Sequence, residues 1–201
     1  MQGKEDPFME KNTSRKQLPA FMVLCIISLV AAVVLAATNL ITRGPIAEHQ
    51  AAELQATLST VLPADTYEAV TVPEGYSVTS LYEAKNGGET VGWSVTASAM
   101  GYGGNGAVTL GVDKNGAVTG CVVGDLNFAE TAGYGARARE PEFQNQFKGL
   151  DAVAGGTFDA LSGATVTSDA VRKATNNALT CVVAVGLGQT PADPVVAFSE
   201  K

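Results

Sequence analysis

The stretch that decides the fold is Ala107–Val123, which reads AVTLGVDKNGAVTGCVV. Two valine-containing runs, 107–112 and 117–123, flank the four residues Asp-Lys-Asn-Gly. An Asn-Gly pair between two β-like runs is a strong hairpin signal, because both residues tolerate the positive φ angles of a tight turn. The stretch therefore predicts two antiparallel strands joined at Asn115 and Gly116.

Further β signals precede this hairpin, and helical signals follow it. Val78–Lys85 alternates weakly, and Thr90–Ala99 (TVGWSVTASA) is rich in β-branched residues. A short helical piece after Pro141 and an amphipathic helix over Ser168–Val185 complete the pattern. We therefore expect an α+β fold, in which helices pack on an antiparallel sheet. The tail after Gly186 is expected to run irregularly over the surface.

A long apolar segment lies near the N-terminus. Gln17–Thr42 contains 26 residues without a charge, and Ser28 is the only polar side chain of Ala20–Ala37. A helix of about 20 residues crosses the roughly 30 Å of hydrocarbon in a bilayer. The segment therefore predicts a transmembrane helix over residues 18–42. A cleaved signal peptide is the alternative, although its apolar region is usually about 7–15 residues long.

Basic residues predict the orientation of this helix. Lys11, Arg15 and Lys16 precede the segment, whereas Arg43 is the only Lys or Arg between its end and Lys85. The positive-inside rule places residues 1–17 in the cytoplasm and residues 44–201 outside it. We therefore expect a single-pass protein of the cell membrane.

The chain beyond the membrane is expected to have three parts. Pro45 suits the first turn of a helix, and apolar residues then recur at helical spacing up to Val61. This spacing predicts a connector helix over residues 43–62, which Pro63 ends. Residues 63–190 are expected to form the folded domain, and residues 191–201 a C-terminal tail.

Composition excludes several classes of function. Residues 44–201 carry 17 acids and 8 bases, a balance of −9, which argues against nucleic-acid binding. The three cysteines show no CxxC or Cys/His spacing, so no metal site is predicted. We interpret Cys121 and Cys181 as small buried residues, and a disulfide between them remains the alternative.

The segment 159–168, DALSGATVTS, lies just before the last predicted helix. The free N–H groups and the dipole of a helix start favour an anion such as a phosphate. Thr165 would place a hydroxyl beside such an anion. The alternative is purely structural, with Thr167 or Ser168 as a simple N-cap and Ser-Gly-Ala as a tight turn.

The pattern Asp159-x-x-Ser-Gly-Ala-Thr165 is more specific than a helix cap. It resembles the flavinylation signature D-x-x-(S/T)-G-A-(T/S) of the FMN-binding subunits of the Rnf and sodium-pumping NADH:quinone reductase complexes. At average residue usage, a chance match in a chain of this length is on the order of one in a thousand. The length of 201 residues is closer to that of the Rnf G subunit than to that of the longer C subunit of the quinone reductase.

Two further segments carry the same resemblance. Gly101–Gly104 (GYGG) looks like a segment of the family that precedes a strand hairpin, and Glu130–Gly135 (ETAGYG) resembles its ETPGLG loop. The chain departs from the loop at Ala132, in place of Pro, and at Tyr134, in place of Leu. The glycines that allow close backbone approach to a ligand are kept.

The resemblance implies FMN joined by a phosphoester to Thr165 in a reaction performed by a flavin transferase. Asp159 would serve that reaction or the turn. The implied cofactor-binding residues are Thr165, Ser162, Gly163, Ala164, Val166 and Thr167 around the phosphate, and Tyr102, Gly103, Glu130, Thr131, Gly133 and Tyr134 near the isoalloxazine ring. No catalytic residue is expected apart from the flavin itself.

The resemblance also implies a function. The chain would be the electron-relay component of a membrane-bound, ion-translocating ferredoxin:NAD oxidoreductase, with other Rnf membrane subunits as partners. One alternative is a free-standing, membrane-anchored flavoprotein that passes electrons to an extracellular acceptor. The other is a membrane-tethered binding domain without a cofactor.

Overall fold

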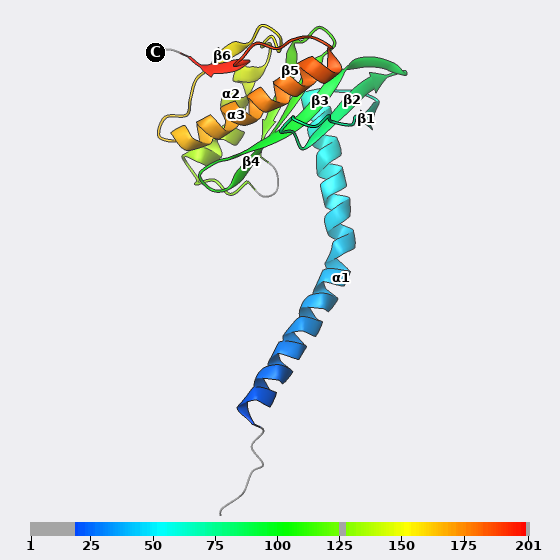
Figure 1. Cartoon of the computed structure of the whole chain (residues 1–201), viewed down its shortest axis with the longest axis vertical. Helices are drawn as coiled ribbons and strands as arrows, with labels where there is room; N and C mark the ends of the chain where they lie inside the picture. Colours follow the sequence, from blue (N-terminus) through cyan, green and yellow to red (C-terminus); the bar gives the residue numbers. More distant parts are fainter. Residues whose placement is uncertain (1–18, 125–127, 200–201) are drawn as a thin grey trace, which may run out of the picture. The chain divides into compact units, whose positions relative to one another are not determined.

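The computed structural model describes residues 19–124 and 128–199 (Figure 1). The predicted cytoplasmic segment 1–17 lies outside the described residues. The chain divides into two compact units, Met1–Gln50 and Ala51–Lys201. The elements follow in the order α1 (Ala20–Val61), β1 (Thr66–Ala69), β2 (Ser80–Asn86), β3 (Glu89–Met100), β4 (Asn105–Asp113), β5 (Val118–Val123), η1 (Gly135–Arg139), α2 (Pro141–Gln144), η2 (Asn145–Phe147), β6 (Gly156–Phe158), α3 (Thr165–Cys181), η3 (Val182–Gly186) and β7 (Val196–Phe198).

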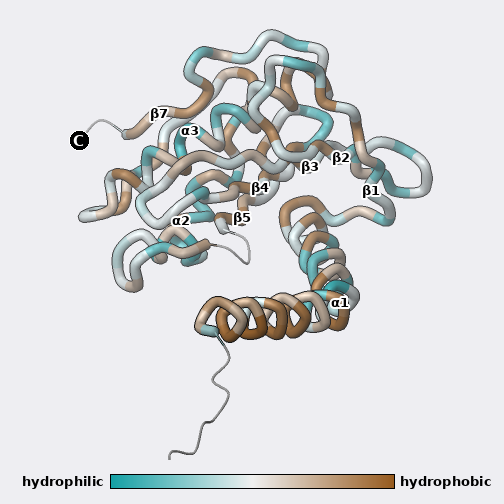
Figure 2. The backbone as a smooth tube through the Cα atoms, turned by 60° about the horizontal axis from the view of Figure 1, so that its bottom comes forward, coloured by the Kyte–Doolittle hydropathy of each residue, from teal (hydrophilic) through white to brown (hydrophobic). Residues whose placement is uncertain are grey.

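The apolar segment and the predicted connector form one continuous helix, α1. An 18-residue window of α1 is apolar enough to cross a membrane, and Figure 2 shows its hydrophobic N-terminal part in brown. The prediction of a separate helix starting near Pro45 is wrong, because Pro45 lies inside α1. A proline removes one backbone hydrogen bond and crowds the preceding turn. The Ala, Glu, Gln and Leu residues that follow favour the helix and allow it to continue.

Five antiparallel strands, β1 to β5, form one sheet in sequence order. The predicted hairpin joins β4 to β5 through a turn in which Gly116 has a φ of +89°. The Oδ1 atom of Asp113 accepts the N–H groups of Asn115 and Ala117 at 2.8 and 2.9 Å. The predicted hairpin is therefore confirmed, and its register shifts once, between Gly111 and Val112.

Helix α3 packs on one face of the sheet, against β3 and β4. Val108, Leu110 and Val112 of β4 point into this core together with Ala174 and Ala178 of α3. The sheet with a packed helix confirms the α+β prediction. Helix α3 begins three residues before the predicted start, and η3 adds a π-helical turn at its end.

Two free thiols belong to this core. Cys121 on β5 is 8% exposed and Cys181 at the end of α3 is fully buried. Burial raises the pKa of both thiols, because a thiolate is poorly solvated there. Their interpretation as small buried residues is confirmed.

The last turn of α1 covers the opposite face of the sheet. Side chains alternate along a strand, so Gly111 faces away from the α3 side. A Cβ on Gly111 would overlap the carbonyl oxygen of Val61, and one on Gly120 would lie 2.9 Å from the Val61 Cα. Thr119 donates its hydroxyl to the same Val61 carbonyl at 2.5 Å. Glycine at these two positions lets the backbone of α1 rest directly on the sheet.

The segment after Gly186 is more regular than predicted. Strand β7 pairs in parallel with β6, and Val195 and Val196 are buried. The side-chain amide of Asn176 accepts the N–H of Val196 and donates to its carbonyl, both at 2.8 Å. The prediction of an irregular path is therefore wrong for these residues, because a side chain of α3 supplies the hydrogen bonds that fix them.

We predict that Gly111→Ala lowers the free energy of unfolding by about 1–3 kcal/mol, the usual cost of overpacking. The new methyl group would overlap the carbonyl of Val61. Thermal or chemical unfolding of the full chain in detergent measures the change. Gly106→Ala is the matched control on the same strand, because its Cβ would lie at an ordinary 3.6 Å from the Phe128 ring. An equal loss in both variants would contradict the prediction.

Candidate functional site

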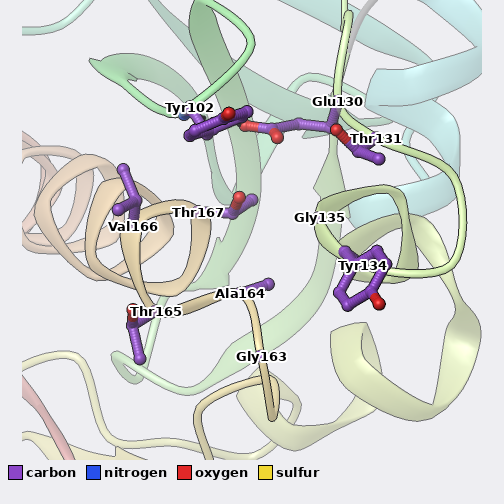
Figure 3. A pocket seen from close by; sticks show the side chains of 10 residues that line it. All are labelled: Tyr102, Glu130, Thr131, Tyr134, Gly135, Gly163, Ala164, Thr165, Val166 and Thr167. Carbon is purple, nitrogen blue, oxygen red and sulfur yellow. Dashed lines mark hydrogen bonds between the residues drawn. The ribbon is translucent and has the colours of Figure 1, made fainter.

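A cavity of about 310 Å³ lies at the N-terminus of α3 (Figure 3). Its volume falls in the range of small-molecule sites, roughly 300–1,000 Å³. Three segments far apart in the sequence form its wall: the loop 101–104, the loop 130–135 and the residues 163–167. The lining residues are Tyr102, Glu130, Thr131, Tyr134, Gly135, Gly163, Ala164, Thr165, Val166 and Thr167.

The start of α3 has no side-chain cap. Thr165 is the first helical residue, and Ala164 is the N-cap with a φ of −133°. The first intrahelical bond runs from the N–H of Ser168 to the carbonyl of Ala164 at 2.9 Å. Among the described residues, the N–H groups of Thr165, Val166 and Thr167 have no hydrogen-bond partner. The N-cap alternative for Thr167 or Ser168 is therefore wrong, and these donors remain available to an anion.

The buried hydroxyl of Ser168 holds the turn that precedes the helix. Its Oγ accepts the N–H of Leu161 at 2.9 Å and donates to the carbonyl of Ala164 at 3.0 Å. Gly163 has a φ of +78° inside this turn, a conformation that favours glycine. The position of Thr165 thus depends on Ser168, a role that sequence reasoning missed. The available signal was its spacing of one helical turn from Ala164.

The other end of the segment is anchored by aromatic packing. The ring of Phe158 lies 4.7 Å from that of Phe147, centroid to centroid, and the N–H of Asp159 donates to Gln146 Oε1 at 2.7 Å. Asp159 and Ser162 line a second cavity of about 400 Å³, not the one beside Thr165. The segment is therefore fixed at both ends, and Ser162 faces away from the place where the sequence predicted it.

Glu130 joins two of the segments. Its Oε1 accepts the N–H groups of Tyr102 at 3.1 Å and Gly103 at 3.4 Å. A Cβ on Gly103 would overlap the carbonyl oxygen of Ala129, so only glycine lets these loops meet. Gly103 thus shapes the wall without lining the cavity.

Gly135 joins the third segment to the other two. A Cβ at this position would lie 2.5 Å from Glu130 Oε2 and 2.6 Å from Thr167 Oγ1. Its absence brings the loop 130–135 against the first turn of α3. Gly135 lines the cavity although sequence reasoning did not select it as a site residue; the signal was the ETAGYG loop that contains it.

The rim of the cavity is apolar. In the described residues after α1, the exposed large apolar side chains are Met100, Tyr102, Tyr134 and Val166. Three of them line the cavity, and Met100 lies two residues before Tyr102. The ring of Tyr134 lies 3.4 Å from where a Cβ on Gly163 would stand. Exposed apolar side chains that gather around one cavity mark a binding surface.

The electrostatics of the cavity are simple. Glu130 is the only acidic or basic residue among those that line it in the described part of the chain. The nearby cations of α3 are already paired, since Lys173 and Arg172 bond to Asp169 at 2.7 and 2.6 Å. These two partners lower the pKa of the Asp169 carboxyl. No lysine or arginine lines the cavity in the described part of the chain.

The structure brings most of the predicted residues together. Those that line the cavity are Tyr102, Glu130, Thr131, Tyr134, Gly163, Ala164, Thr165, Val166 and Thr167. Ser162, Gly103 and Gly133 are not among the lining residues. Gly133 has a φ of +79° and serves the turn of its loop.

Comparisons with known proteins agree with this geometry. A family model described as FMN-binding domain matches residues 101–180, which span all three segments. The chain is 33% identical over 181 residues to the G subunit of the Na⁺-translocating ferredoxin:NAD⁺ oxidoreductase complex of Acetobacterium woodii, covering 77% of this chain and 86% of the relative. It is 32% identical to the G subunit of the ion-translocating oxidoreductase complex of Methanosarcina acetivorans, covering 85% of this chain and 97% of the relative.

A solved structure is also similar. The crystal structure of the C subunit of the Na⁺-translocating NADH-quinone reductase from Parabacteroides distasonis aligns with a TM-score of 0.45 at 23% identity. The alignment covers 52% of this chain and 60% of that chain.

We predict that Ser168→Ala costs about 1–3 kcal/mol of unfolding free energy, because it leaves the buried N–H of Leu161 without an acceptor. Ser162→Ala is the matched control six residues earlier, and its exposed side chain predicts a change within about 0.5 kcal/mol. Chemical denaturation of both variants measures the difference. Equal stabilities would show that the Ser168 hydroxyl does not hold the turn.

Proposed function

This chain belongs to the G-subunit family of ion-translocating oxidoreductase complexes, and on that premise we propose that it is an electron-relay flavoprotein with FMN bound through Thr165. The observation that carries the proposal is the cavity at the uncapped start of α3. Its wall is built from the three segments that resemble the flavoprotein subunits. The complex would link ferredoxin and NAD to ion translocation, and other Rnf membrane subunits would be the partners.

The residues around Thr165 fit the phosphate of FMN. Thr165 is exposed at the first position of α3, where free N–H groups and the helix dipole favour negative charge. Since no cation lines the cavity in the described part of the chain, a phosphate held without a covalent bond would lack ion pairs there. A phosphoester to the Thr165 oxygen would retain the cofactor outside the cytoplasm, where a lost FMN could not be replaced.

The phosphoester would form by transfer of FMN from an activated nucleotide to the hydroxyl of Thr165. The hydroxyl oxygen of Thr165 would bond to phosphorus and lose its proton. A flavin transferase would supply an activated flavin nucleotide, whose leaving group departs from the same phosphorus and carries away the proton of the hydroxyl. The chain therefore gains one FMN less one water. Asp159 and Ser162, which face the neighbouring cavity, would lie on the side from which the transferase approaches.

The rest of the cavity fits the isoalloxazine ring. Tyr102, Tyr134 and Val166 offer apolar surface, while Glu130 and Thr131 supply the polar part of the wall. FMN supplies one- or two-electron transfer, and the protein supplies its position and potential. The residues of this chain would bind and orient the ring and exclude part of the water around it.

The proposed topology follows from the charge pattern. Residues 18–42 would cross the cell membrane, with 1–17 in the cytoplasm and the connector 43–62 outside it. The FMN domain, residues 63–190, and the tail 191–201 would then be extracytoplasmic. The excess of Lys and Arg before the apolar segment supports this orientation.

We predict that Thr165→Ala abolishes covalent flavin. The full chain is co-expressed with a flavin transferase and run under denaturing electrophoresis, where ultraviolet light reveals a fluorescent band. Thr165→Ser, which keeps a hydroxyl, is expected to remain fluorescent. Intact mass should show one FMN less one water on the wild type only in the presence of the transferase. A fluorescent Thr165→Ala band would refute the site, and a dark wild type beside active transferase would refute the function.

We predict that Glu89→Cys reacts with a membrane-impermeant maleimide in intact cells, because Glu89 is exposed at the start of β3 in the domain proposed to lie outside. The wild type is the control. Its Cys121 and Cys181 thiols are buried with a raised pKa, and Cys25 lies in the apolar segment. Labelling of Glu89→Cys only after lysis would reverse the proposed orientation.

A further inference from the structure

Glu130 places a fixed negative charge in the wall of the cavity. Two backbone N–H groups, from Tyr102 and Gly103, hold its Oε1 atom. These two bonds restrict rotation of the carboxylate away from the loop 101–104. In Figure 3 the Glu130 side chain lies toward Tyr102, across the cavity from Thr165.

The second carboxylate oxygen is confined as well. Glu130 Oε2 and the Thr167 hydroxyl lie so near Gly135 that a Cβ there would approach them within 2.5 and 2.6 Å. Glu130 thus stands where the three segments of the wall meet. No cation among the described lining residues compensates its charge.

We propose that the negative charge of the Glu130 carboxylate lowers the reduction potential of the flavin in this cavity. The inference rests on the proposed function and deepens it. Reduction adds electron density to the isoalloxazine ring, and a nearby negative charge opposes that addition. Because Glu130 is held by backbone donors, its charge stays beside the cavity in both redox states. Glu130 would therefore act through the electric field of its carboxylate and not through a bond to the flavin.

The magnitude follows from Coulomb's law. At a separation of about 10 Å and an effective dielectric constant of about 20, one unit charge changes an equilibrium roughly tenfold. For a one-electron couple, a tenfold change corresponds to about 59 mV. An effect of this size is measurable by titration.

The test is a redox titration of the full flavin-loaded chain in detergent, followed by flavin absorbance. Glu130→Gln keeps an oxygen that can accept the two N–H groups but removes the charge. The midpoint potential should therefore rise by about 59 mV, which corresponds to a tenfold change in the equilibrium constant of a one-electron couple. Glu130→Asp keeps the charge and should stay closer to the wild type than Glu130→Gln. A rise of equal size in both variants would mean that geometry rather than charge acts, and would overturn the proposal.

Glu89→Gln is the matched control, since it removes the same charge from the far end of β3. Met100 lies eleven positions after Glu89, which is roughly 36 Å along the strand. This variant should leave the potential unchanged. A shift in Glu89→Gln as large as that in Glu130→Gln would show that only net charge matters and would overturn the proposal.

A second variant keeps the proposal testable if Glu130→Gln fails to load flavin. Thr131→Lys changes an exposed side chain of the same cavity wall and adds the opposite charge beside Glu130. It should raise the midpoint potential, and an unchanged potential would overturn the proposal. The wild type separates the two hypotheses, because absence of covalent flavin from it refutes the proposed function, whereas a normal load with no shift in the variants refutes only the role of Glu130.

Discussion

The site depends on the hydroxyl of Ser168, which is buried and uses both its donor and its acceptor capacity within one turn of chain. It accepts from Leu161 and donates to Ala164, so the turn before α3 closes onto the helix that follows it. The hydroxyl bonds none of the first N–H groups of α3, and no other side chain caps them in the described part of the chain. Thr165, Val166 and Thr167, the residues that carry these N–H groups, line the cavity.

The sequence predicted those helices and strands that are specified by residues close together in the chain. The β4–β5 hairpin follows from Asn115 and Gly116, and α3 follows from its apolar stripe. Strands β6 and β7 are three residues long and show no periodicity. The side chain of Asn176, a residue of α3, bonds the backbone of β7 twenty residues later in the sequence. The continuity of α1 through Pro45 was also not predictable, because it depends on the helix-favouring residues on both sides of the proline and not on the proline alone.

The candidate site shows the same division. The segments of the cavity could be found because each carries a compact pattern of glycines and hydroxyls. The cavity that each residue lines could not be predicted, because contacts between distant segments decide it. Ser162 lines a second cavity. Gly135 must be glycine because Glu130 and Thr167 lie so close to it. The importance of Gly111 for the fold arises likewise from contact with Val61, fifty residues earlier.

The loop 130–135 departs from its family pattern at two positions and still closes the cavity. The carbonyl of Thr131 accepts the N–H groups of Tyr134 at 3.2 Å and Ala136 at 3.1 Å, so the main chain specifies the curve of this loop. Gly133 supplies the positive φ, and Gly135 the close approach. The path of the loop is therefore specified by its main chain and its glycines, and not by the side chains at 132 and 134. In this chain the side chain at 134 is an exposed aromatic ring in the wall of the cavity, so the ring can be exchanged for another side chain while the main chain still closes the wall.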